Sequence, residues 1–237
     1  MAFNINEIRS QLALGGARPT LFQVNITNPA NSSGDDIILH NKKLNLYNLR
    51  QQIAKRGGKP NYCLSDFIAP IDSGKKDWIG GFAVTAGFNV EKIGQDFADN
   101  NDDYKSIMIK VLGDRIAEGL AEKMHEKVRT ELWGYSKNEC LNNEDLIKEK
   151  YVGIRPAPGY PSCPDHSEKL ALFDLLDIAN NSKLKLTESY AVYPASSVSG
   201  WYFSHPDSRY FGISRICLLY TSPSPRDATL SRMPSSA

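Results

Sequence analysis

A proline-rich strip, residues 153–161, combines the residue types best suited to holding a small ligand, in the order Gly-Ile-Arg-Pro-Ala-Pro-Gly-Tyr-Pro. Its three prolines fix φ and lack a backbone N–H, which predicts a stiff, extended segment that presents unpaired carbonyl oxygens. Arg155 offers a guanidinium suited to a carboxylate, and Tyr160 offers a flat face for a ring. Gly159 lets a ligand approach the backbone. The alternative is a rigid loop whose prolines end the preceding helix and whose arginine pairs with a surface acid.

Glu118 is a second candidate, because it interrupts the apolar stripe of a long predicted helix. It lies seven residues after Val111, on the face that begins with Tyr104 and Ile107. A carboxylate at the margin of a core can face a cationic ligand. The alternative is a stripe that drifts around the helix and leaves Glu118 in solvent, as most helix charges are.

Several common catalytic and nucleotide-binding patterns are absent from the sequence. It contains no G-x-S-x-G, G-x-G-x-x-G or G-x-x-x-x-G-K-[ST] pattern, which argues against a serine hydrolase, a Rossmann nucleotide site and a P-loop enzyme. Cys163 and His166 are spaced like half of a zinc site, but no second pair lies at a suitable distance. We therefore expect no metal site and no catalytic residue.

Composition narrows the class of protein further. The chain has 237 residues, 28 basic and 27 acidic, and a net charge of +1, so it has no strong field to attract nucleic acid or anionic lipid. It lacks an apolar run long enough to span a membrane and a signal-like start, which predicts a cytoplasmic protein. The four scattered cysteines are expected to be reduced thiols.

The elements that must position the proline strip form a mixed pattern. Hydrophobic periodicity and capping residues predict helices over residues 43–56, 103–133, 143–150 and 167–178. Shorter β-like runs predict strands over residues 61–69, 78–88, 186–192, 200–204 and 210–216, the last three as an antiparallel meander. The expected fold is an α+β (mixed α/β), non-Rossmann domain in which helices pack on a twisted, mostly antiparallel sheet.

Six motifs together resemble the activation domain of cobalamin-dependent methionine synthase over about residues 37–216. They are residues 63–70 (CLSDFIAP), 77–85 (DWIGGFAVT), 153–160 (GIRPAPGY), 164–169 (PDHSEK), 186–189 (LTES) and 197–206 (SVSGWYFSHP). That resemblance implies an S-adenosyl-L-methionine site. The binding residues that it implies are Arg155, Ala157, Gly159, Tyr160, Tyr210, Phe211, Glu118 and Glu149.

The resemblance also implies a role within a larger methyltransferase. In that family the domain binds S-adenosylmethionine as the methyl donor that returns cobalamin to activity after reduction of cob(II)alamin, commonly by flavodoxin. The expected partners are therefore a cobalamin-binding module and a flavodoxin-type reductant. The cobalamin, homocysteine and folate modules are absent from this sequence, as is a region before residue 36 that supplies an acidic ligand contact. We expect a truncated module that does not turn over alone.

The two ends of the chain differ from its middle. Residues 1–30 resemble the start of a contractile-phage tail tube protein, and a turn-forming cluster over residues 28–35 marks a boundary. Residues 217–237 are rich in Ser, Pro, Thr and Arg and resemble read-through sequence, which predicts a disordered tail. The predicted segments are 1–35, 36–216 and 217–237. The alternative functions are a phage tail tube subunit and an inert chimeric fragment.

Overall fold

A five-stranded antiparallel sheet forms the centre of the molecule, in a computed structural model that describes residues 23–53 and 55–213. The strand order is β3-β2-β1-β4-β7, and every neighbouring pair is antiparallel. The strands are β1 (Gln23–Ser33), β2 (Asp36–Leu39), β3 (Leu44–Leu46), β4 (Asp77–Thr85) and β7 (Ser197–Tyr202). A separate ribbon pairs β5 (Lys185–Leu186) with β6 (Val192–Tyr193). The open antiparallel sheet confirms the predicted α+β fold.

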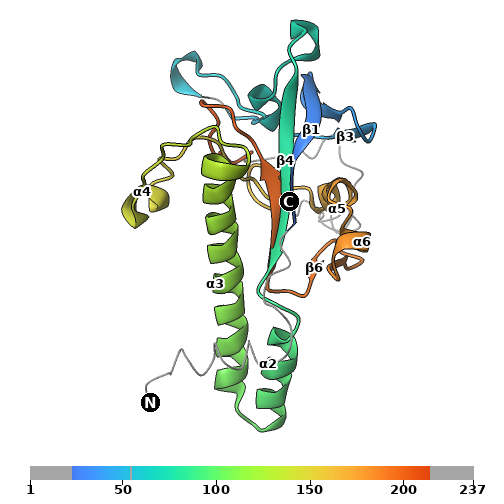
Figure 1. Cartoon of the computed structure of the whole chain (residues 1–237), viewed down its shortest axis with the longest axis vertical. Coiled ribbons are helices and arrows are strands. Elements are labelled where there is room, and N and C mark those ends of the chain that lie inside the picture. Colours follow the sequence, from blue (N-terminus) through green and yellow to red (C-terminus); the bar gives the residue numbers. More distant parts are fainter. Residues whose placement is uncertain (1–22, 54, 214–237) are drawn as a thin grey trace, which may run out of the picture.

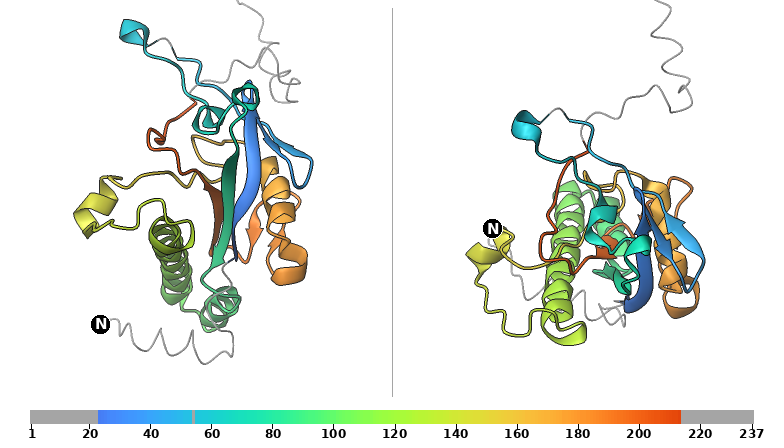
Figure 2. Two further views of the ribbon diagram at one scale, coloured as in Figure 1. Left: turned by 45° about the horizontal axis from the view of Figure 1, so that its top comes forward. Right: turned by 90° about the horizontal axis from the view of Figure 1, so that it is seen from above.

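Helices cover both faces of this sheet. The long helix α3 (Asp103–Lys127) lies along one face, whereas α5 (Lys169–Leu175) and α6 (Ile178–Asn181) lie on the other (Figures 1 and 2). The helix α2 (Val90–Asp99) packs against the first part of α3, and α4 (Asn143–Ile147) lies away from the sheet. None of the helices within the described ranges is long and apolar enough to cross a membrane.

The alternation of side chains along β4 and β7 creates two separate apolar clusters, one on each face. Ile79 and Trp201 point toward α5, in a large cluster that includes Leu172 and Leu176. The side chains at even positions on these strands, including Phe82, point toward α3. The predicted strand over residues 78–88 is therefore confirmed, and it is buried on both sides because helices cover both faces.

Glycine in β4 is explained by the close approach of α5. A Cβ atom on Gly81 would lie 2.9 Å from Cδ1 of Leu172, closer than two carbon atoms can pack. A glycine here lets the leucines of α5 reach the backbone of the strand.

The face of α3 that meets the sheet differs from the predicted stripe. Small residues make the contact, among them Gly113, Ala117 and Ala121. Met124 and Val128, near the end of the helical segment, are buried, but the predicted stripe is exposed at Tyr104, Ile107 and Val111. The reason is visible in Figure 1, where the first part of α3 extends beyond the end of the sheet together with α2.

Of the other predicted elements, one helix is confirmed, two helices differ in extent, and the meander is wrong. The helix predicted over residues 103–133 is confirmed, because α3 continues into a π-helical turn, η4 (Val128–Leu132). The helix predicted over 143–150 is shorter, and that over 167–178 is divided into η5 (His166–Glu168) and α5. The meander is wrong, since β5 pairs with β6 whereas β7 pairs with β4, and residues 210–213 form no strand.

Two further predictions are wrong for local reasons. Residues 43–56 are not a helix, because Leu44–Leu46 pair with β2 as the edge strand and Lys43 has a φ of 50°. Residues 61–69 are not a strand, because η2 (Leu64–Phe67) is a short 3₁₀ turn in which the Asp66 side chain accepts the N–H of Cys63. A hairpin pairing in the first segment and a side-chain cap in the second thus override the apolar pattern.

The expected boundary over residues 28–35 lies inside the sheet. The strand β1 continues to Ser33 and pairs with both β2 and β4. Its polar residues fit a strand because their side chains are paired: the amide of Asn28 donates to the Ile79 carbonyl, and that of Asn31 donates to the Ala69 carbonyl. The predictions for residues 1–22 and 217–237 lie outside the described residues.

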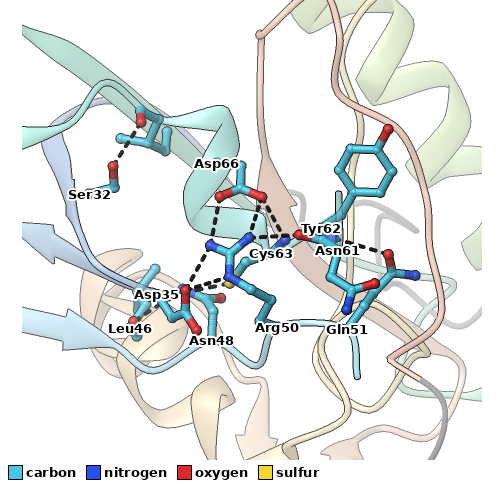
Figure 3. Close-up of polar contacts among 11 residues, drawn as sticks. Ser32, Asp35, Leu46, Asn48, Arg50, Gln51, Asn61, Tyr62, Cys63 and Asp66 are labelled. Carbon is cyan, nitrogen blue, oxygen red and sulfur yellow. Dashed lines mark hydrogen bonds and ion pairs between the residues drawn. The ribbon is translucent and has the colours of Figure 1, made fainter. Parts of the chain in front are cut away.

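An arginine cluster ties the segment after β3 to the rest of the domain (Figure 3). The guanidinium of Arg50 binds both carboxylate oxygens of Asp66, at 2.8 and 2.7 Å, and its Nε donates to Asp35 at 2.8 Å. The next residue, Gln51, is buried, and Oε1 of its side-chain amide accepts the N–H of Tyr62 at 3.0 Å.

Candidate functional site

The proline strip is attached to the sheet as an extra edge beside β7. Ile154 and Phe203 exchange two backbone hydrogen bonds of 3.0 Å, and the Trp201 N–H donates to the Pro156 carbonyl at 2.9 Å. Gly200 permits this approach, because a Cβ atom there would lie 2.6 Å from the Pro156 oxygen. The strip is therefore extended and rigid, as predicted, but it is held by the sheet as well as by its prolines.

The expected row of unpaired carbonyl oxygens is wrong for much of the strip. Besides Ile154 and Pro156, the carbonyl of Ala157 accepts the N–H of Tyr160, and that of Pro161 accepts the N–H of Ile213. Prolines remove donors from the strip itself, but neighbouring segments supply donors in their place. Ligand recognition at this strip must therefore rely chiefly on its side chains.

A tight turn over residues 157–163, at the end of the strip, gives Gly159 a structural role. Its N–H donates to the Cys163 carbonyl at 2.7 Å, and its φ is +98°. A Cβ atom on Gly159 would lie 2.4 Å from Cε1 of His166. Both the positive φ and this contact require glycine. The side on which a side chain would project is thus occupied by an imidazole.

The helix α3 brings two acids to the strip, one helical turn apart. The Tyr160 hydroxyl donates to Oε1 of Glu118 at 3.4 Å, and Nη2 of Arg155 donates to Oε2 of Glu122 at 2.6 Å. Residues four apart on a helix share one face, which is why both acids reach the same strip. Glu118 is thus partly buried beside the strip.

The segment with Tyr210 and Phe211 is fixed from several sides. The Tyr210 hydroxyl accepts the backbone N–H of Arg155 at 2.9 Å, and the Phe211 N–H donates to the Ser162 hydroxyl at 3.1 Å. The side chain of Gln51 donates to the Gly212 carbonyl at 2.8 Å. The arginine cluster of Figure 3 therefore supports this segment through its neighbour Gln51.

Together these elements enclose a cleft of about 420 Å³. Seven of the eight residues predicted to bind a ligand line it: Glu118, Glu149, Arg155, Ala157, Tyr160, Tyr210 and Phe211. The eighth, Gly159, lines an adjoining cleft of about 460 Å³, which shares Glu118, Ala157 and Tyr160 with the first. Residues separated by more than 90 positions in the sequence thus form one continuous concave surface, which is the usual form of a small-molecule site.

The environment of the cleft sets the charge of its side chains. Burial raises the pKa of Tyr210, and burial together with Glu118 raises the pKa of Tyr160. Both rings are therefore neutral at physiological pH. Burial is the strongest single influence on Arg155 and acts to lower its pKa, but the hydrogen bond to Glu122 and the charges of Glu122, Tyr210 and Tyr151 together outweigh it, and the pKa is raised. The guanidinium is thus cationic, and two acidic residues, Glu118 and Glu149, line the same cleft.

Sequence reasoning missed two residues of this region. Tyr151 also lines the cleft, with its ring under the guanidinium of Arg129 at 4.5 Å. Glu122 holds Arg155 from behind the lining. The spacing of Glu122, four residues after Glu118 on a predicted helix, was an available signal. No local pattern marked Tyr151, because its position depends on the path of the chain between α4 and the strip.

The fold and the cleft define a non-Rossmann α+β domain with a cleft lined by charged, aromatic and small apolar side chains. A family model described as the vitamin B12 dependent methionine synthase activation domain matches residues 18–218. A solved structure, described as the MetH reactivation domain bound to AdoHcy, is 45% identical with a TM-score of 0.78, covering 90% of this chain and 69% of that chain. The chain belongs to the family of vitamin B12-dependent methionine synthase activation domains. The tail tube alternative is not supported.

Proposed function

We propose that this chain is an S-adenosylmethionine-binding reactivation module and that the ligand lies in the cleft along the proline strip. The observation that carries the proposal is the match of charges. The lining has two carboxylates, Glu118 and Glu149, and one guanidinium, Arg155. S-adenosylmethionine carries two positive groups, its sulfonium and its ammonium, and one carboxylate. The similar solved structure is described with AdoHcy, the demethylated form of the same ligand.

Each lining group has a distinct part in this proposal. Arg155 binds the carboxylate of the ligand through a charge-assisted hydrogen bond. Glu118 and Glu149 lie near its positive groups. The neutral rings of Tyr210 and Phe211, in a segment fixed by Ser162 and Gln51, provide an apolar wall for the adenine. The chain binds and orients the ligand, and contributes no group that reacts with it.

We infer that the module functions as part of a larger, cytoplasmic protein. S-adenosylmethionine supplies the methyl group, and a cobalamin held by a separate module of methionine synthase receives it after reduction by a flavodoxin-type partner. This chain therefore has no expected turnover of its own. Its measurable property is ligand binding.

Isothermal titration calorimetry with S-adenosylmethionine tests the proposal. Wild type is expected to bind, and Arg155→Ala to bind at least about tenfold more weakly, because a hydrogen bond between charged groups contributes about 1.5 to 3 kcal/mol. Arg115→Ala is a matched control, since Arg115 is exposed on α3 and does not line the cleft. Equal binding by wild type and Arg155→Ala would exclude the role of Arg155. Absence of binding by wild type would favour an inert fragment.

A further inference from the structure

Arg155 is held in place from two directions. Its backbone is fixed, because Ile154 pairs with Phe203, Pro156 accepts the N–H of Trp201 in β7, and its own N–H donates to the Tyr210 hydroxyl. Its guanidinium is held by one acceptor from a different element, Oε2 of Glu122 on α3, at 2.6 Å from Nη2. The spacing between α3 and the sheet therefore decides where the guanidinium points.

The Glu122–Arg155 pair differs from the surface ion pairs of this chain. The side chains of Glu122 and Arg155 are only 28% and 18% exposed. Oε1 of Glu122 and Nε of Arg155 are buried, and neither has a hydrogen-bond partner within the described residues. The hydrogen bond to Glu122 thus holds a guanidinium whose Nε has no partner among the described residues. By contrast, Glu126 pairs with Lys123 on the exposed side of the same helix.

We propose that Glu122 is a positioning residue, which holds the guanidinium of Arg155 so that its free N–H groups face the carboxylate of the bound amino-acid moiety. Arg155 lines the cleft, whereas Glu122 lies behind it and is not part of the lining. Glu122 therefore acts on the ligand only through Arg155. The inference rests on the proposed function, because it assigns a specific part of the ligand to Arg155.

A competing role for Glu122 predicts the opposite behaviour. If its negative charge mainly neutralised Arg155, removal of that charge would strengthen binding of a carboxylate. If its reach positions Arg155, the length of the side chain matters more than its charge. Glutamine keeps the reach and an acceptor oxygen but loses the charge, whereas aspartate keeps the charge but withdraws the oxygen by one carbon–carbon bond.

Two ligands and three variants separate these roles. S-adenosylmethionine and its decarboxylated form, which retains the sulfonium and the ammonium, are titrated into the full chain by calorimetry. The quantity compared is the ratio of the two dissociation constants. We expect Glu122→Asp to weaken S-adenosylmethionine by about tenfold relative to the decarboxylated ligand, the size of one charge-assisted hydrogen bond. We expect Glu122→Gln and the control Glu126→Gln to keep the wild-type ratio.

The outcomes distinguish this inference from the proposed function. If wild type binds neither ligand, the proposed function fails. If wild type binds S-adenosylmethionine but Glu122→Asp weakens both ligands equally, the effect is a general one on the fold and the positioning role is wrong. A variant Glu122→Gln that changes the ratio while Glu122→Asp keeps it would assign the effect to charge and would also overturn the inference.

Discussion

Replacing Glu168 by glutamine removes a charge that the fold buries. Glu168, in η5, is 7% exposed, and its Oε1 accepts the N–H of Tyr47 at 3.0 Å. Burial raises the pKa of its carboxyl from 4.5 to about 7, although the hydrogen bond from Tyr47 acts to lower it. Nearby Asp165 and Asp36 add to the rise. The folded protein therefore favours the neutral form of this side chain.

The sign of the effect follows from proton binding. Between pH 4.5 and about 7 the folded state binds more protons at Glu168 than the unfolded state, so the free energy of unfolding falls as pH rises. The contribution is fully present below pH 4.5 and is lost above about 7. One pKa unit corresponds to about 1.4 kcal/mol, so the rise to about 7 amounts to about 3 kcal/mol at most.

Glu168→Gln should remove this pH dependence, because the amide does not titrate. We expect the stability of the variant relative to wild type to increase by about 2 to 3 kcal/mol between about pH 4 and pH 8. Urea unfolding followed by circular dichroism at several pH values measures the difference. The exposed residue Glu188 provides a matched control, Glu188→Gln. A difference between Glu168→Gln and wild type that stays constant across this range would refute the reasoning.

Three further substitutions test other parts of the structure. Arg129→Met should lower the free energy of unfolding, measured with urea, by about 3 to 5 kcal/mol. The reason is that Arg129 is fully buried and binds Glu139 at 2.6 Å. Adding Glu139→Leu should restore most of the loss. Gly159→Ala should lower the free energy of unfolding by about 1 to 3 kcal/mol, because its φ is +98°. If His166→Ala recovers part of this loss, that part is due to the contact between the new methyl group and His166. Tyr210→Phe removes the acceptor for a backbone N–H and should cost about 1 kcal/mol, measured by the urea midpoint; an unchanged midpoint would contradict that hydrogen bond.

Elements with a strong local pattern were predicted correctly, whereas elements that depend on pairing with other parts of the chain were not. The long helix was predictable because its caps and its apolar spacing extend over many turns. The strand β4 was predictable because its glycines and apolar residues are typical of a buried strand. The helix expected over residues 43–56 failed, since its apolar spacing was accidental and pairing of Leu44–Leu46 with β2 decided the outcome. The polar strand β1 was missed because its asparagines find partners only in the folded chain.

The site shows the same division between local chemistry and tertiary geometry. The stiffness of the proline strip and the chemistry of Arg155 follow from residue type alone, because prolines fix φ and a guanidinium remains charged. Residue types alone therefore marked the strip as a candidate ligand-binding segment, and the motifs around it identified the family.

Which side chains line the cleft depends on how distant elements pack together. Several carbonyl oxygens of the strip accept N–H groups of β7 and neighbouring segments. The lack of a side chain at Gly159 leaves room for His166. Glu122 reaches Arg155 because small residues let α3 lie close to the sheet. Such pairings depend on distances between elements far apart in the chain, and no local pattern in the sequence encodes those distances.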